Sequence, residues 1–258
     1  EYYDTYYVPN NMAICMSGDF DYEQAIRLID SRFGSMKSKP VPTYIPGKEE
    51  PIIKPIVKEV FGPDAESMLL AYRVGGQKTA DSELSEIAAK ILYNGTAGLM
   101  DLNLNQQQKV LSSSVFPYIL KDYGVFILDA NAKEGQTLEQ TKDLVLAEVE
   151  KLKNGDFPDW MMKAIINDIK LQQTKEYEDN GSRAMAMVGA FIQEESWTDF
   201  TNRINKLGAI TKEQVVAWAK ANFNQNYVVV YKRNGEDKNV QKVNKPEITP
   251  VEVNRDAQ

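Results

Sequence analysis

The chain has 258 residues, of which 43% are hydrophobic and 26% charged, as in a globular protein with room for one large domain or two small ones. Its net charge of −7 and its lack of a basic cluster argue against a nucleic-acid partner. The chain contains no histidine and a single cysteine, Cys15, which excludes an internal disulfide, a Ser-His-Asp triad and a histidine-ligated zinc site.

A strand, a tight turn and a capped helix are predicted first along the chain. The apolar run within Asn11 to Gly18 predicts the strand. Asp21 and Gln24 have the spacing of an N-cap and N3 pair, and the helix that they open is predicted to end at Gly34. Residues 36–63 are rich in proline, which predicts an extended connector.

Further strands are predicted after the connector, some of them joined in a hairpin. The run Val125 to Leu128 is apolar on both faces, which is typical of a covered central strand. Pro117 indicates that its hairpin partner lies nearer an edge or contains a bulge. The predicted strands are Ser67 to Val74, Val110 to Ile119, Tyr123 to Ala132 and Asn226 to Lys232.

Helical patterns separate these strands. Capping boxes at Thr137/Gln140 and Thr211/Gln214 open two of the helices. The others are predicted at Leu84 to Leu92, 96–108 and Pro158 to Glu178, with helical character continuing to Phe223. We therefore expect one α+β domain over residues 1–240, with a mainly antiparallel sheet covered on one face by helices, and a linker at 241–258.

The sequence predicts no catalytic centre, metal ligand or cofactor site in this chain. Its acidic clusters at Glu49-Glu50, Glu176 to Asp179 and Glu194-Glu195 are interpreted as solvated charge. It contains neither a phosphate-binding G-x-x-x-x-G-K-[ST] loop nor a G-x-S-x-G nucleophile turn. No apolar run reaches the length of a membrane span, so no span is expected in this segment.

A family resemblance rests on several motifs that occur in order. The stretch "YYVPNNMAICMSGDFDYEQAIRLIDSRFG" at residues 6–34 resembles a segment of the insulinase/pitrilysin family of zinc metallopeptidases. The proline-rich connector, the turn "NGTAGL" at 94–99 and "KLKNGDFPDW" at 151–160 follow as in the family. The ending "AITKEQVVAWAKANFNQNYVVVYKRNG" is also similar, so the resemblance covers most of residues 1–235.

The resemblance implies that the metal site lies outside this chain. Family members carry an H-x-x-E-H motif on a helix upstream of the matched region, where its histidines bind zinc and its glutamate activates water. We therefore expect zinc in the parent protein, a missing catalytic domain to which residues 1–35 could belong, and a missing second half after 241–258. In family members the second half supplies an arginine and a tyrosine that help to stabilise the tetrahedral intermediate. The best-matching positions in this chain are Leu104-Asn105 and Ser112, which cannot supply this pair, so the resemblance favours the zinc-bearing half.

The resemblance also implies a place for the peptide substrate. In family members an exposed strand and a neighbouring turn hold the substrate's end by main-chain pairing, away from the zinc. The match falls on Val110 to Val115 and Asn94 to Gly98. The candidate anchoring residues are Asn94, Gly95, Gly98, Ser112, Ser113, Ser114 and Val115; the alternative is an ordinary polar edge.

Two other functions stay open at this stage. One is a non-enzymatic relative of the family that serves as a scaffold or assembly subunit, which the absence of H-x-x-E-H upstream of Glu1 would indicate. The other is an unrelated binding domain, which a different fold would reveal. A bacterial cell-envelope location fits the resemblance.

Overall fold

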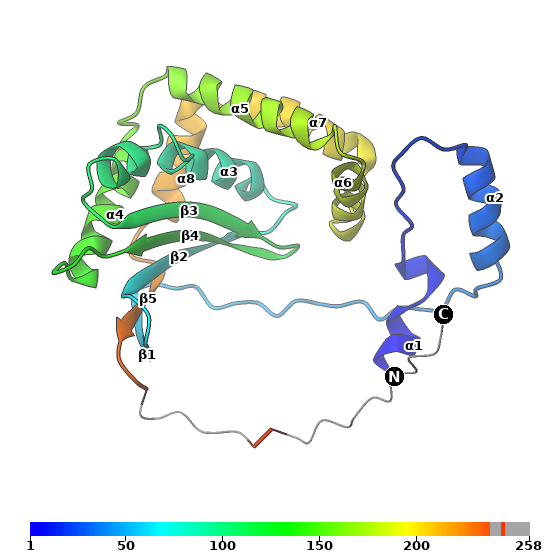
Figure 1. The fold of residues 1–258 in the computed structure, drawn as a ribbon, viewed down its shortest axis with the longest axis horizontal. Coiled ribbons are helices and arrows are strands. Elements are labelled where there is room, and N and C mark those ends of the chain that lie inside the picture. The colour runs from blue at the N-terminus through cyan, green and yellow to red at the C-terminus, as the bar shows by residue number, and fades with distance from the viewer. Residues whose placement is uncertain (238–243, 246–258) are drawn as a thin grey trace, which may run out of the picture.

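The computed structural model describes residues 1–237, 244 and 245, so most of the expected linker at 241–258 lies outside the described residues. Figure 1 shows a sheet with a layer of helices on one side, and an N-terminal segment beyond one end of the sheet. Ser17 of this segment accepts a hydrogen bond from Arg183 of the helical part (2.9 Å). A long extended connector runs from this segment below the sheet to its first strand.

Five strands form one sheet in the order β1-β5-β2-β4-β3. β1 pairs with β5 in parallel and the other pairs are antiparallel, which confirms the predicted α+β class and mainly antiparallel sheet. The strands are β1 (Ile56–Gly62), β2 (Ser67–Gly75), β3 (Ser112–Ile119), β4 (Tyr123–Asn131) and β5 (Tyr227–Asn234). The prediction that all of 36–63 is a connector is wrong at its end, where β1 forms. This strand was not predicted because it is largely exposed and lacks the alternating burial that marks a strand.

Two of the helices after the sheet's hairpin, α4 and α8, begin where capping residues predicted. Thr137 and Thr211 each accept a hydrogen bond from the N3 amide, while the N3 glutamine side chain accepts from the N-cap amide, so both capping boxes are confirmed. The helices are α3 (Asp81–Leu92), α4 (Leu138–Asn154), α5 (Trp160–Glu176), α6 (Asn180–Ile192), α7 (Trp197–Gly208), α8 (Lys212–Asn222) and a π-helical turn, η2 (Asp101–Asn105).

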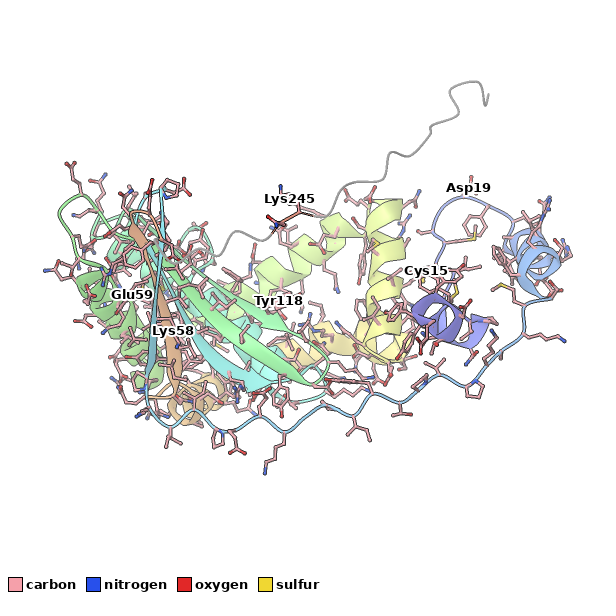
Figure 2. All side chains as sticks on the ribbon, turned by 90° about the horizontal axis from the view of Figure 1, so that it is seen from below. Cys15, Asp19, Lys58, Glu59, Tyr118 and Lys245 are labelled. Carbon is pink, nitrogen blue, oxygen red and sulfur yellow. The ribbon has the colours of Figure 1, made fainter. Side chains whose placement is uncertain are left out.

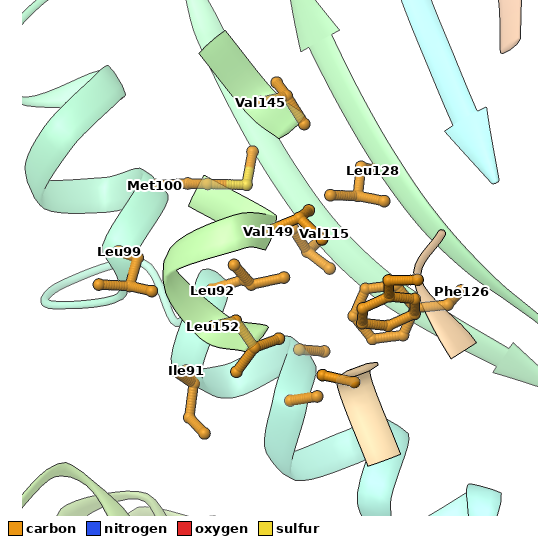
Figure 3. Packing of buried hydrophobic residues seen from close by; sticks show 14 of the residues in the cluster. Ile91, Leu92, Leu99, Met100, Val115, Phe126, Leu128, Val145, Val149 and Leu152 are labelled. Atoms are coloured by element: carbon orange, nitrogen blue, oxygen red, sulfur yellow. The ribbon is translucent and has the colours of Figure 1, made fainter. Parts of the chain in front are cut away.

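The hydrophobic core lies between this helical layer and one face of the sheet. In β4, Phe126 and Leu128 are fully buried toward the helices, as Figure 3 shows, while Val125 and Ile127 alternate with them and are partly exposed. The prediction that this strand is covered on both faces is therefore wrong, because in the described part of the chain the helices lie on one side only. Pro117 does lie on an edge strand, as predicted.

The N-terminal segment consists of α1 (Tyr2–Tyr6), a 3₁₀ turn η1 (Pro9–Asn11) and α2 (Tyr22–Phe33). Asp21 caps α2 by accepting from the Gln24 amide at 2.9 Å, as predicted. The predicted strand at Asn11 to Gly18 is wrong for this chain, since an extended segment becomes a strand only when another strand pairs with it. Met12, Ile14 and Met16 of this segment are exposed.

We predict that Phe126→Ala lowers the free energy of unfolding by about 3–5 kcal/mol, because it opens a cavity in the core. The Phe126 ring contacts Phe223 and Trp218, with centroids 4.7 and 6.1 Å away. Phe116→Ala is the matched control: this side chain, on the adjacent strand, is 46% exposed and faces away from the helices. Urea unfolding measures both variants, and equal losses would contradict one-sided burial.

Candidate functional site

β3 is an edge strand that presents main-chain groups to solvent. The bond from Leu120 N–H to Tyr123 C=O (3.0 Å) closes the β3–β4 hairpin. Because hydrogen-bonded pairs alternate along an antiparallel ladder, the main-chain groups of Val115, Pro117 and Ile119 point away from β4. Proline lacks an N–H, so this edge offers a donor and an acceptor at Val115 and Ile119 but only an acceptor at Pro117.

The beginning of this edge is already occupied by a side chain. Asn105, at the end of η2, donates from Nδ2 to the Ser113 carbonyl (2.9 Å) and accepts at Oδ1 from Ser113 Oγ (2.8 Å). Ser113 is 4% exposed. Asn105 therefore stands where a pairing strand would begin, and the available edge extends from Val115 to Ile119.

The turn between α3 and η2 is held in shape by one buried carboxylate. Asp101 Oδ2 accepts from the amides of Asn94, Gly95 and Gly98 at 2.9–3.0 Å. Gly95 has φ +81°, which favours glycine, and a side chain on Gly98 would collide with the Leu92 carbonyl at 2.6 Å. The turn is thus a rigid loop in which three amides point inward to Asp101.

The structure places the predicted anchoring residues at two ends of one π-helical turn. Asp101 organises the turn at Asn94 to Gly98, and Asn105, four residues later, contacts β3. Within β3, Ser112 and Ser114 face the helix-free side of the sheet, whereas Ser113 and Val115 face the helices. Neither Asn105 nor Asp101 was predicted from the sequence. The Asn105 contact with β3 depends on tertiary structure, and Asp101 accepts from amides up to seven residues before it, which no short turn motif indicates.

The helix-free face of the sheet carries a group of exposed apolar side chains. Figure 2 looks toward it from below, with Tyr118 of β3 and Lys58 of β1 labelled. Its exposed apolar side chains include Leu69, Phe116, Tyr118 and Val60, at 40%, 46%, 59% and 48% exposure.

Two charged side chains flank the apolar part of β2 and β4 on this face. Arg73 lies on β2 near the hairpin, opposite Val125, and Asp129 lies on β4 farther along, opposite Leu69. Burial among these neighbours raises the pKa of the Asp129 carboxyl, although a backbone hydrogen bond at Ala130 opposes the shift. A face of this kind can take an extended peptide, with apolar contacts along its middle and opposite charges at its ends.

The described residues contain no group of three His, Cys, Asp or Glu side chains placed to hold a metal ion. Of the helices that the structure describes, none combines the length and the hydropathy of a membrane span.

Comparison with known families matches residues 1–169 to a family described as the peptidase M16 inactive domain. A search of curated protein sequences finds no match.

Several solved structures share the fold at low sequence identity. A protease from Helicobacter pylori superimposes with a TM-score of 0.77 at 20% identity, covering 84% of this chain and 54% of that one. The periplasmic protease PqqL of Escherichia coli gives 0.70 at 15% identity, covering 91% and 28%. A chain of complex III2 from Candida albicans gives 0.68 at 14% identity, covering 83% and 53%. The chain thus spans about half or less of the length of these structures.

We predict that Asp129→Asn raises the melting temperature at pH 7. The raised pKa means that the folded state binds the proton more tightly than the unfolded chain does, so stability falls as pH rises from the unfolded pKa, about 3.9, through the folded pKa. Asparagine does not ionise, so the variant does not lose stability as the pH rises. Its excess in melting temperature over the native chain should therefore shrink toward pH 3. Because Asp129 is partly exposed, the effect is small. Asp122→Asn, in the exposed hairpin loop, is the control, and an equal gain there would contradict the prediction.

Proposed function

Because the chain belongs to the peptidase M16 inactive domain family, we propose that it is the non-catalytic domain of the zinc-bearing half of a two-half peptidase, and that it forms a wall of the substrate chamber. The observation that carries this proposal is the open, apolar, helix-free face of the sheet. Exposed apolar patches of this kind mark interaction surfaces. The catalytic zinc then belongs to the domain upstream, whose H-x-x-E-H motif supplies the ligands and the general base.

The exposed apolar side chains of the N-terminal segment favour the catalytic domain as its partner. Among residues 1–36, large apolar side chains are exposed along the chain, including Met12, Ile14 and Met16, which have no strand partner in the described part of this chain. A strand from another domain would pair with this segment and cover those side chains. We propose that residues 1–35 complete the sheet of the catalytic domain, and that the linker at 241–258 leads to the second half.

The edge of β3 supports a second part of the proposal, the anchoring of the substrate's end. An extended peptide pairs with an open edge through main-chain hydrogen bonds, which makes recognition tolerant of sequence. The Asn105 contact at Ser113 limits the pairing to Val115 through Ile119, downstream of most of the residues that the sequence singled out. The turn at Asn94 to Gly98 has a supporting role, because its amides are engaged by Asp101.

A scaffold or assembly subunit is the second candidate function. The observation that favours it is the similarity to a chain of complex III2, an assembly in which the same fold occurs. The full-length sequence separates the two candidates: H-x-x-E-H upstream of Glu1 supports the peptidase, and its absence there supports the scaffold.

We predict that this chain alone binds no zinc tightly and cleaves no peptide, because it has no histidine and a single cysteine. Isothermal titration with zinc chloride, in parallel with an EDTA-treated sample, measures the first point. A stoichiometric site of micromolar affinity would contradict the prediction and place the metal in this domain.

We predict that Val115→Pro weakens binding of an extended peptide at least about threefold, because it removes an outward N–H from the edge of β3. The probe is a fluorescein-labelled ten-residue peptide of alternating threonine and valine, followed by fluorescence polarisation. Val115→Ala, which keeps the N–H, is the matched control, and urea unfolding confirms that both variants are folded.

Val115 is a better position for this test than Ser113, because Ser113 is itself bonded to Asn105 and a change there would disturb the fold of the edge. Equal binding by the native and Val115→Pro chains would remove the edge from the proposed function and leave the chamber wall alone.

A further inference from the structure

The chain's own connector is bound to the helix-free face of the sheet at its hairpin end. Tyr123 accepts at its hydroxyl from the Glu49 amide (3.3 Å) and donates to the Gly47 carbonyl (3.5 Å). Arg73 donates from Nη1 to the Glu50 carbonyl (2.8 Å) and from Nη2 to the Glu49 carboxylate (3.3 Å). Figures 1 and 2 show the connector passing close to the hairpin end of the sheet on its way to β1.

These four contacts recognise two features of an extended chain, its main-chain atoms and one carboxylate. Three go to main-chain atoms of Gly47, Glu49 and Glu50, which any extended peptide presents. The fourth goes to a carboxylate, which selects an acidic residue at one position. A guanidinium provides two donors in a fixed fork, so one arginine can bind a carboxylate and a neighbouring carbonyl together.

The position of Arg73 and Tyr123 makes this contact accessible. Arg73 is on β2 and pairs with Val125, and Tyr123 begins β4 opposite Gly75, so both belong to the helix-free face. Side chains of Arg73 and Glu49 are 31% and 58% exposed, and a pair that is exposed to this degree is weak and screened by salt. The connector can therefore leave the site without unfolding the domain.

We propose that Arg73 and Tyr123 form a binding site for an extended acidic peptide segment, and that the connector at 47–50 occupies this site as an internal competitor. The site rests on the proposed function in taking an extended peptide as its ligand, and it adds a preference for a carboxylate. It is separate from the edge of β3, because it binds on the face of the sheet through side chains rather than along the edge through main-chain pairing.

Trypsin cleavage after Lys48 measures whether the connector is bound, since this bond lies inside the held segment. Cleavage after Lys37, in the same connector but outside the held segment, is the internal reference. In the full chain, Arg73→Gln and Tyr123→Phe should each raise the ratio of Lys48 to Lys37 cleavage at least about threefold, because they free the segment for local opening. Lys58→Gln, on the same face at the far edge, is the control and should leave the ratio unchanged. Equal ratios in the native and Arg73→Gln chains would overturn the proposal.

Competition then tests the site itself. The probe is a synthetic peptide with the sequence of residues 45–52 in which Lys48 is replaced by Gln, so that trypsin does not cut it. Added in excess, it should raise the ratio in the native chain and not in the Arg73→Gln chain, and a peptide with both glutamates also replaced by Gln should act more weakly. No change with the first peptide would overturn the binding site. This failure is distinguishable from that of the edge of β3, which Val115→Pro reports with the threonine–valine probe.

Discussion

Burial of alternate side chains of β2 and β4 under one layer of helices is the interaction on which the rest of the structure depends. Tyr72 and Phe126 each lie 4.7 Å from the Phe223 ring at the end of α8, which ties the middle of the sheet to the C-terminal helix. Because the strand period is two, this packing sends the intervening residues to the opposite face. The helix-free face is therefore a direct consequence of how the core is built.

A sheet that is covered by helices on one side has two edges and one open face. In this domain different contacts occupy the β3 edge and the open face. At one edge, Asn105 occupies the beginning of β3 and Pro117 removes a donor, both of which limit uncontrolled strand pairing. On the open face, the connector lies across the hairpin end, where Arg73 and Tyr123 hold it. What remains accessible is a short length of edge, from Val115 to Ile119, and the exposed apolar side chains of the open face.

The chain belongs to the peptidase M16 inactive domain family and contains no histidine. The same fold occurs in proteases and in a complex III2 chain that are at most 20% identical to this chain. The fold by itself therefore does not determine the function.

The sequence by itself determined the fold class, the two capping boxes, the hairpin and the family, because each of these depends on residues close together in the chain or on motif order. Tertiary structure decided the rest. Val125 to Leu128 is apolar throughout, yet only the placement of the helices decides which of its faces is covered. β1 and the unpaired segment at 11–18 show the same limit, since a strand exists only where a partner is available. Asn105, Arg73 and Tyr123 contact residues 8 to 76 positions away, and no local pattern carries such contacts.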